Sequence, residues 1–159
     1  MCIRDSINTD HFVSEAVSII KSTIAESNED VFRMSLCGGG TPRPVYEALV
    51  NEVIEWENLE ITFSDERCVP PDHDDSNYKM AADALLSKVP IKENNMIRIK
   101  GELDPVESAS LCEDELRKRS GGSIYVHDLL LLGMGEDGHT ASLFPVSYTH
   151  LTLPTKRIV

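Results

Sequence analysis

The chain of 159 residues has few basic side chains: 15 Lys and Arg stand against 27 Asp and Glu, a formal net charge of −12. A nucleic-acid backbone needs a basic face, so we expect no nucleic-acid partner. No apolar run approaches the roughly 20 residues that a membrane-spanning helix requires, and no signal-peptide pattern opens the chain. We therefore expect no membrane association and a cytoplasmic location.

The sequence also lacks paired cysteines. Its four cysteines, Cys2, Cys37, Cys68 and Cys112, lie far apart with no CxxC spacing. This argues against a zinc site and a disulfide framework, and suits a reducing compartment. The acidic run Asp72-His73-Asp74-Asp75 could suggest a metal site. Carboxylates with one histidine on a polar loop are more often solvated, so we expect no metal there.

Strand-like and helix-like segments alternate along the body of the chain. We expect helices over residues 8–27, 42–49, 77–86 and 105–119, and strands over residues 31–37, 59–64, 96–100 and 128–132. The first helix would bury one stripe, made of Phe12, Ala16, Ile19, Ile20 and Ile24. The last strand is a leucine run bounded by glycines, which is typical of a fully buried parallel strand. The pattern predicts an α/β fold with a parallel sheet and helices on both faces.

Polar loops follow three of these strands, and could converge at the carboxyl edge of the sheet, where such folds bind ligands. The first, Gly38-Gly39-Gly40-Thr41, offers backbone N–H groups, a hydroxyl and a following helix N-terminus to an anion. The alternative is a tight turn without a ligand. The second, Asp65-Glu66-Arg67, carries an arginine suited to a phosphate or carboxylate. The alternative for Arg67 is a surface ion pair of little energetic value.

The third loop, residues 135–142, presents a histidine after a glycine-rich turn that begins at Gly133. His139, with Asp137 two residues before it, is a candidate general base. It could also be a metal ligand together with Asp137, or a histidine with a structural hydrogen bond. The glycines of residues 133–138 match the G-x-G-x-x-G pattern of dinucleotide sites. That fingerprint needs an acid about 20 residues further on, and residues 140–159 contain no Asp or Glu. We therefore set the dinucleotide interpretation aside.

Four ordered segments together resemble 6-phosphogluconolactonase, within the glucosamine-6-phosphate isomerase/6-phosphogluconolactonase family. They are SLCGGGTPRPVYEAL (residues 35–49), ITFSDERCVP (61–70), DDSNYKMA (74–81) and LLLLGMGEDGHTASLFP (129–145). The resemblance implies a Rossmann-like fold and an enzyme that needs no metal or organic cofactor. It also implies hydrolysis of 6-phospho-D-glucono-1,5-lactone, a phosphosugar lactone, to 6-phospho-D-gluconate in the oxidative branch of the pentose phosphate pathway.

The resemblance also implies roles for individual residues. His139 would activate a water that attacks the lactone carbonyl, and Asp137 would set the environment of His139. Gly39, Gly40 and Thr41 would hold the 6-phosphate, and Gly38 and Gly138 would belong to the same substrate site. Arg67 would neutralise the phosphate or the oxyanion that forms during attack. These parts suit ester hydrolysis, which needs an activated water, a place for negative charge and an orienting handle.

Two alternatives stay open. Glucosamine-6-phosphate deaminase shares the fold, but it would read more like GHIAFNEP where this chain has GHTASLFP at residues 138–145. It would also lack the combination of Asp65-Glu66-Arg67 with Ser76-Asn77-Tyr78. The second alternative is a non-catalytic sugar-phosphate binding module with the same fold.

The two ends do not follow the alternating pattern. Residues 1–6 and 146–159 resemble translated adapter sequence, so we expect a partial native domain over residues 7–145 that is incomplete at its C-terminus. The alternative is that residues 151–153 and 157–159 are short strands. The family pattern continues through further strands, helices and a late lysine near the phosphate. We do not assign that role to Lys156, and the sequence leaves the oligomeric state open.

Overall fold

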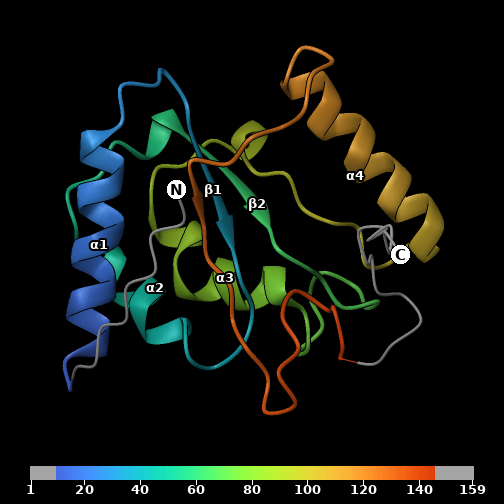
Figure 1. Ribbon diagram of the computed structural model, residues 1–159, viewed down its shortest axis with the longest axis horizontal. Helices are drawn as coiled ribbons and strands as arrows, with labels where there is room; N and C mark the ends of the chain where they lie inside the picture. The colour runs from blue at the N-terminus through green and yellow to red at the C-terminus, as the bar shows by residue number, and fades with distance from the viewer. Residues whose placement is uncertain (1–9, 146–159) are drawn as a thin grey trace, which may run out of the picture.

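A parallel three-stranded sheet forms the centre of the computed structural model, which describes residues 10–145 (Figure 1). The strands are β1 (Phe32–Leu36), β2 (Leu59–Phe63) and β3 (Leu129–Leu130), in the order β2-β1-β3. β1 pairs with β2 along its whole length, and with β3 at Met34 opposite Leu129 and Ser35 opposite Leu130. The tails that the sequence predicts at residues 1–6 and 146–159 lie outside the described residues.

The described residues also form four α-helices: α1 (Phe12–Glu26) before β1, α2 (Arg43–Leu49) between β1 and β2, and α3 (Asn77–Ala84) and α4 (Pro105–Arg119) between β2 and β3. Short 3₁₀ helices cover Trp56–Asn58, Leu86–Lys88 and Glu93–Asn95. Side-chain caps fix two helix starts: Ser76 accepts from the backbone N–H of Lys79, and Asp104 accepts from those of Val106 and Glu107. Such caps satisfy donors that have no partner inside the helix.

The helices lie on both faces of the sheet, as predicted. Alternate residues of a strand point to opposite faces. Met34 and Ile61 point into the apolar core, which also takes side chains from α1, α2 and α3. Glu60 lies on the opposite face, where Arg119 of α4 donates to it at 2.6 Å. Figure 1 shows α4 apart from the other three helices.

The prediction of which residues the first helix buries is wrong in part. Val17 and Ile20 are its buried residues, while the side chains of Phe12 and Ile19 are 47% and 44% exposed. Ile20 therefore meets the core as expected, but the buried face is turned toward Val17. Phe12 is the first residue of α1, and it borders a surface cavity that is described below.

Two predicted strands are shorter than the sequence suggests. Residues 96–100 form only a single parallel bridge, between Met96 and Ile61. The chain leaves the sheet after it, in a segment where Arg98 pairs with Glu102. The strand predicted at residues 128–132 is not fully buried: Leu130 and Leu132 are 47% and 52% exposed. Among the described residues β3 pairs only with β1, so this segment lies at an edge of the sheet.

The strand order creates a ligand-binding position. β2 lies on one side of β1, and β3, the last strand in sequence, lies on the other. Open α/β sheets bind ligands outside the carboxyl ends of two such strands, at the point where the strand order reverses. The loops after β1 and β3 therefore lie at the expected place. Within residues 10–145, no helix has the length and apolar character needed to cross a membrane.

Candidate active site

The three predicted loops meet at one cavity of about 420 Å³ at the carboxyl edge of the sheet. The cavity is lined by Phe12, Ser64, Asp65, Arg67, Asn77 and residues 37–42, 132–135 and 139–141. The expected convergence of the loops is therefore confirmed. Asp137 and Gly138 do not line this cavity, although both belong to the loop that carries His139.

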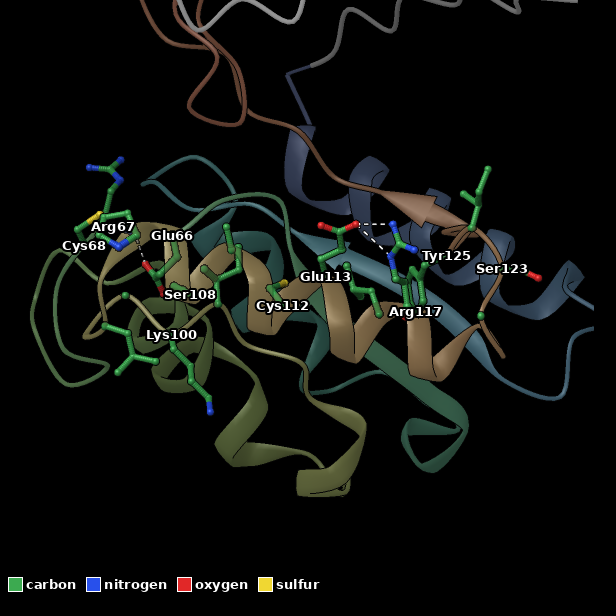
Figure 2. Close-up of a pocket in the computed structure, with 18 residues that line it drawn as sticks. Glu66, Arg67, Cys68, Lys100, Ser108, Cys112, Glu113, Arg117, Ser123 and Tyr125 are labelled. Carbon is green, nitrogen blue, oxygen red and sulfur yellow. Dashed lines mark hydrogen bonds and ion pairs between the residues drawn. The ribbon is translucent and has the colours of Figure 1, made fainter.

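A larger cavity, of about 850 Å³, runs along α4 (Figure 2). It shares only Arg67 with the smaller one. Figure 2 shows Arg67 at the end of this groove, with its side chain directed away from α4. Because the groove contains neither the glycine loop nor His139, the smaller cavity is the candidate active site.

The glycine loop starts from a strand end that is held by a buried tyrosine. The hydroxyl of Tyr46 donates to the carbonyl of Cys37 at 2.9 Å and accepts from its N–H at 3.0 Å. Burial raises the pKa of Tyr46, so its hydroxyl stays protonated and can donate. Gly39 has φ +101°, a conformation that favours glycine.

The glycine loop is open toward the cavity. A Cβ at Gly39 or Gly40 would meet nothing within 4 Å. The amide groups of residues 38–41 make no hydrogen bond within the part of the chain that the structure describes. Since α2 has only seven residues, an anion here would be bound mainly by these loop amides and the Thr41 hydroxyl.

In the second loop, Glu66 and Arg67 have different surroundings. The Glu66 carboxylate accepts from the backbone N–H groups of Arg67, Asn77 and Tyr78 and from the Ser76 hydroxyl. Glu66 therefore fixes this loop to the start of α3. Arg67 is exposed, and its guanidinium has no ion-pair or hydrogen-bond partner within residues 10–145. The surface ion pair that the sequence left open is not formed there.

The third loop orients an imidazole. His139 Nδ1 lies 2.5 Å from Asp137 Oδ1, and this hydrogen bond lowers the pKa of Asp137 below its usual value. Because an ionised carboxylate only accepts, the shared proton belongs to Nδ1. The Nε2 lone pair is then available as a base. The Phe144 ring stacks on His139 with centroids 4.5 Å apart, which fixes the plane of the imidazole.

Two glycines allow this arrangement for different reasons. A Cβ at Gly135 would lie 2.2 Å from Cε1 of His139, so only glycine lets the ring approach the backbone. Gly138 has φ +85°, which favours glycine, while a Cβ there would make only an ordinary contact with Pro145, at 3.9 Å. Its conformation accounts for its identity, and its predicted contact with substrate stays a prediction.

No helix begins within residues 133–145, although a dinucleotide turn must open one. The described residues contain no cluster of three or more His, Cys, Asp or Glu that could hold a metal. In the acidic loop, His73 Nδ1 instead accepts from the backbone N–H of Asp75 at 3.2 Å. The histidine that pairs with a carboxylate beside the candidate site is therefore His139, with Asp137, and not His73 of the acidic loop.

The sequence prediction missed Asn77 and Ser142. Asn77 is 5% exposed and donates to the Asp65 side chain and carbonyl. Ser142 donates to the same carboxylate from the third loop. Both residues lie inside the segments that carry the family resemblance, but no spacing rule connects residues 65 and 142. Only the fold brings them together.

Comparison with known proteins agrees with this site. Residues 7–159 match the family model described as glucosamine-6-phosphate isomerases/6-phosphogluconolactonase. A curated 6-phosphogluconolactonase of Synechocystis is 42% identical over 79% of this chain and 53% of its own length. One of Nostoc is 38% identical over 80% of this chain and 55% of its own. The chain thus spans about half the length of these curated relatives.

Solved structures show the same relationship. The 6-phosphogluconolactonase of Thermotoga maritima matches with a TM-score of 0.81 and 32% identity, over 88% of this chain and 63% of that one. That of Trypanosoma brucei matches with a TM-score of 0.71 and 28% identity, over 86% and 60% of the two chains. The Rossmann-like fold that the sequence predicts is therefore confirmed. Fold, motifs and identity agree: the chain belongs to the glucosamine-6-phosphate isomerase/6-phosphogluconolactonase family.

Proposed function

We propose that this chain carries the catalytic base and the phosphate-binding loop of a hydrolase that converts 6-phospho-D-glucono-1,5-lactone to 6-phospho-D-gluconate in the cytoplasm. The observation that carries the proposal is the hydrogen bond from His139 to Asp137, beside an open glycine loop whose amides make no hydrogen bond to the described part of the chain. The names of the curated relatives support the same substrate.

The reaction follows from the free Nε2 of His139. A water oxygen bonds to the lactone carbonyl carbon while its proton passes to Nε2, and Asp137 stabilises the imidazolium that forms. The tetrahedral intermediate then collapses, the bond to the ring oxygen breaks, and that oxygen takes the proton from Nε2. The product carboxylic acid ionises and releases one proton. No other group is consumed.

The remaining loops would orient the substrate. The amides of Gly38, Gly39 and Gly40, with the Thr41 hydroxyl, offer donors to the 6-phosphate. Arg67, whose guanidinium has no partner within residues 10–145, would neutralise either the phosphate or the oxyanion. Gly138 would belong to the same substrate site through the turn that delivers His139.

The test compares three activities. Purified 159-residue chain should accelerate hydrolysis of 6-phosphogluconolactone above its spontaneous rate, and should release no ammonia from glucosamine 6-phosphate. Because the chain spans about half of its relatives, a second protein is needed: residues 10–145 placed in the Synechocystis relative in exchange for the aligned segment. That chimera should hydrolyse the lactone.

Two outcomes would contradict the proposal. Ammonia release would assign the chain to the deaminase. Saturable binding of 6-phosphogluconate without turnover, in a folded chimera, would instead indicate a non-catalytic binding module.

A further inference from the structure

The Asp65 carboxylate joins the loop after β2 to the start of α3 and to the loop that carries His139. It accepts from Ser64 Oγ at 3.2 Å and from Asn77 Nδ2 at 3.3 Å through Oδ1, and from Ser142 Oγ at 2.5 Å through Oδ2. Both of its oxygens are therefore engaged by the protein.

The side-chain amide of Asn77 holds Asp65 in place from the start of α3. Its Nδ2 also donates to the Asp65 carbonyl at 3.1 Å, and the Asn77 side chain is buried against Gly38 so closely that a Cβ there would lie 1.8 Å from Asn77 Oδ1. The start of α3, the glycine loop and the loop after β2 thus form one rigid support.

The loop that carries His139 contains a turn in an uncommon backbone conformation. Ala141 has φ +47° and Ser142 has φ +60°, values that non-glycine residues rarely adopt and that the surrounding structure must maintain. Within the turn, the N–H of Leu143 donates to the carbonyl of Thr140 at 2.8 Å. Among the described residues, the Ser142–Asp65 hydrogen bond is what ties this turn to the loop after β2.

We propose that Asp65 is a positioning residue for the reaction: it holds Ser142, and through the Ala141-Ser142 turn it keeps the His139 imidazole at the cavity. This inference rests on the proposed function for its kinetic part. A base displaced by about 1 Å can cost about 100-fold in rate, because the reacting atoms must lie near attack geometry. Asp65 acts through His139, not on the substrate.

The first test needs no catalysis. Backbone amides of Gly135, Gly138 and Leu143 are hydrogen-bonded within the His139 loop, so their hydrogen exchange reports loop opening. Asp65→Asn and Ser142→Ala should each speed their exchange about tenfold, as expected for loss of one hydrogen bond to a charged group. Ser142→Gly, which adopts positive φ without strain, should loosen the loop less than Ser142→Ala.

The control is Ser87→Ala, which also removes one hydroxyl hydrogen bond (to the carbonyl of Ala82, 2.8 Å) but lies far from the site in the fold. It should leave these amides unchanged. Unchanged exchange in both Asp65→Asn and Ser142→Ala would overturn the inference, as would faster exchange spread evenly over the core strands.

The second test is kinetic and uses the chimera with residues 10–145. Asp65→Asn and Ser142→Ala should each lower kcat about tenfold with KM nearly unchanged, and the double variant should lose no more than the worse single variant. A rise in KM alone would overturn the inference. Faster exchange in the variants, together with no turnover by the parent protein, would refute the proposed function but not the role of Asp65 in holding the loop. The two failures are therefore distinguishable.

Discussion

Gly38 is a position where the absence of a side chain lets two parts of the site pack against each other. Its φ is ordinary, so its backbone would accept alanine. The constraint is contact: the side chain of Asn77 fills the place of a Cβ, with Oδ1 and Cγ at 1.8 and 2.2 Å from it. Gly40, two residues further on, has open space at the same atom.

Gly38→Ala is therefore expected to lower the free energy of unfolding by about 1–3 kcal/mol, the usual cost of forcing extra volume into a packed site. Gly40→Ala is the matched control and should change the unfolding free energy by less than about 0.5 kcal/mol. Urea unfolding followed by circular dichroism measures both. Equal stability of the two variants would show that Asn77 is not packed as described.

Arg67→Ala should lower kcat/KM for 6-phosphogluconolactone about ten- to hundredfold, since a hydrogen bond to a charged group is worth about 1.5–3 kcal/mol. Unphosphorylated gluconolactone separates the two roles that remain open. A loss confined to the phosphorylated substrate indicates a phosphate contact, and a loss of kcat with both substrates indicates the oxyanion. Arg117→Ala, whose parent side chain is paired with Glu113 on α4, is the control. Parental kinetics in Arg67→Ala would refute both roles.

At the scale of single residues, the sequence predicts those residues whose side-chain type itself indicates a chemical role. His139, Asp137, Arg67 and the glycine loop are recognisable because histidine, arginine and consecutive glycines have few other uses beside a strand end. Asn77 and Ser142 are common polar residues, and their importance comes from hydrogen bonds to Asp65 that span 12 and 77 residues of the chain. A linear pattern contains no signal for such a contact.

Among the elements, the turn after the Met96 bridge contains an ion pair that strongly lowers the pKa of its acid. Arg98 binds both carboxylate oxygens of Glu102, at 2.8 and 2.5 Å. These hydrogen bonds lower the pKa of Glu102 from 4.5 to about 2. A carboxyl group with a lowered folded-state pKa stabilises the fold above its unfolded pKa, and that contribution is lost as the pH falls through the folded one.

Arg98→Gln should therefore raise the pKa of Glu102 back toward 4.5. NMR titration of the Glu102 side-chain carboxyl carbon measures it directly. The stability difference between parent and variant should be largest above pH 4.5 and should shrink between pH 4.5 and about 2. Arg117→Gln, which removes a different i,i+4 pair, should leave the Glu102 titration unchanged. A Glu102 titration midpoint that is the same in the parent and in Arg98→Gln would contradict this account.

The elements themselves follow from the sequence where local signals agree. α4 begins at Pro105 behind its Asp104 cap and ends at Arg119, which are the bounds that the sequence predicts. The strand signals at residues 96–100 and 128–132 were less reliable, because strand length depends on neighbours rather than on propensity. The first segment bends away after one bridge, and the second has a neighbour on one side only among the described residues.

Across the whole molecule, exposed apolar side chains concentrate in the last part of the described chain. Ile124, Val126, Leu130, Leu132 and Met134 are all between 47% and 87% exposed. Several of them lie on or beside β3, whose outer edge has no strand partner within residues 10–145. An open apolar edge strand is a template for association with another chain.

The 159-residue chain should therefore self-associate as its concentration rises, and Val126→Lys with Leu130→Lys should reduce this. Sedimentation velocity over a concentration series measures it. The control is Val53→Lys, which changes a 96% exposed valine that is distant from β3 in the fold. Self-association that is equal in all three proteins would show that β3 is not the associating edge.

The central claim is that His139 is the base of a lactone hydrolase, and one kinetic comparison tests it most directly. The chimera with residues 10–145 is assayed with 6-phosphogluconolactone as the parent, as His139→Ala and as His73→Ala. His73, half exposed in the acidic loop, is the matched control. Loss of a general base should lower kcat about 10²- to 10⁴-fold in His139→Ala, with the His73→Ala rate equal to that of the parent. Equal rates in His139→Ala and the parent would contradict the account.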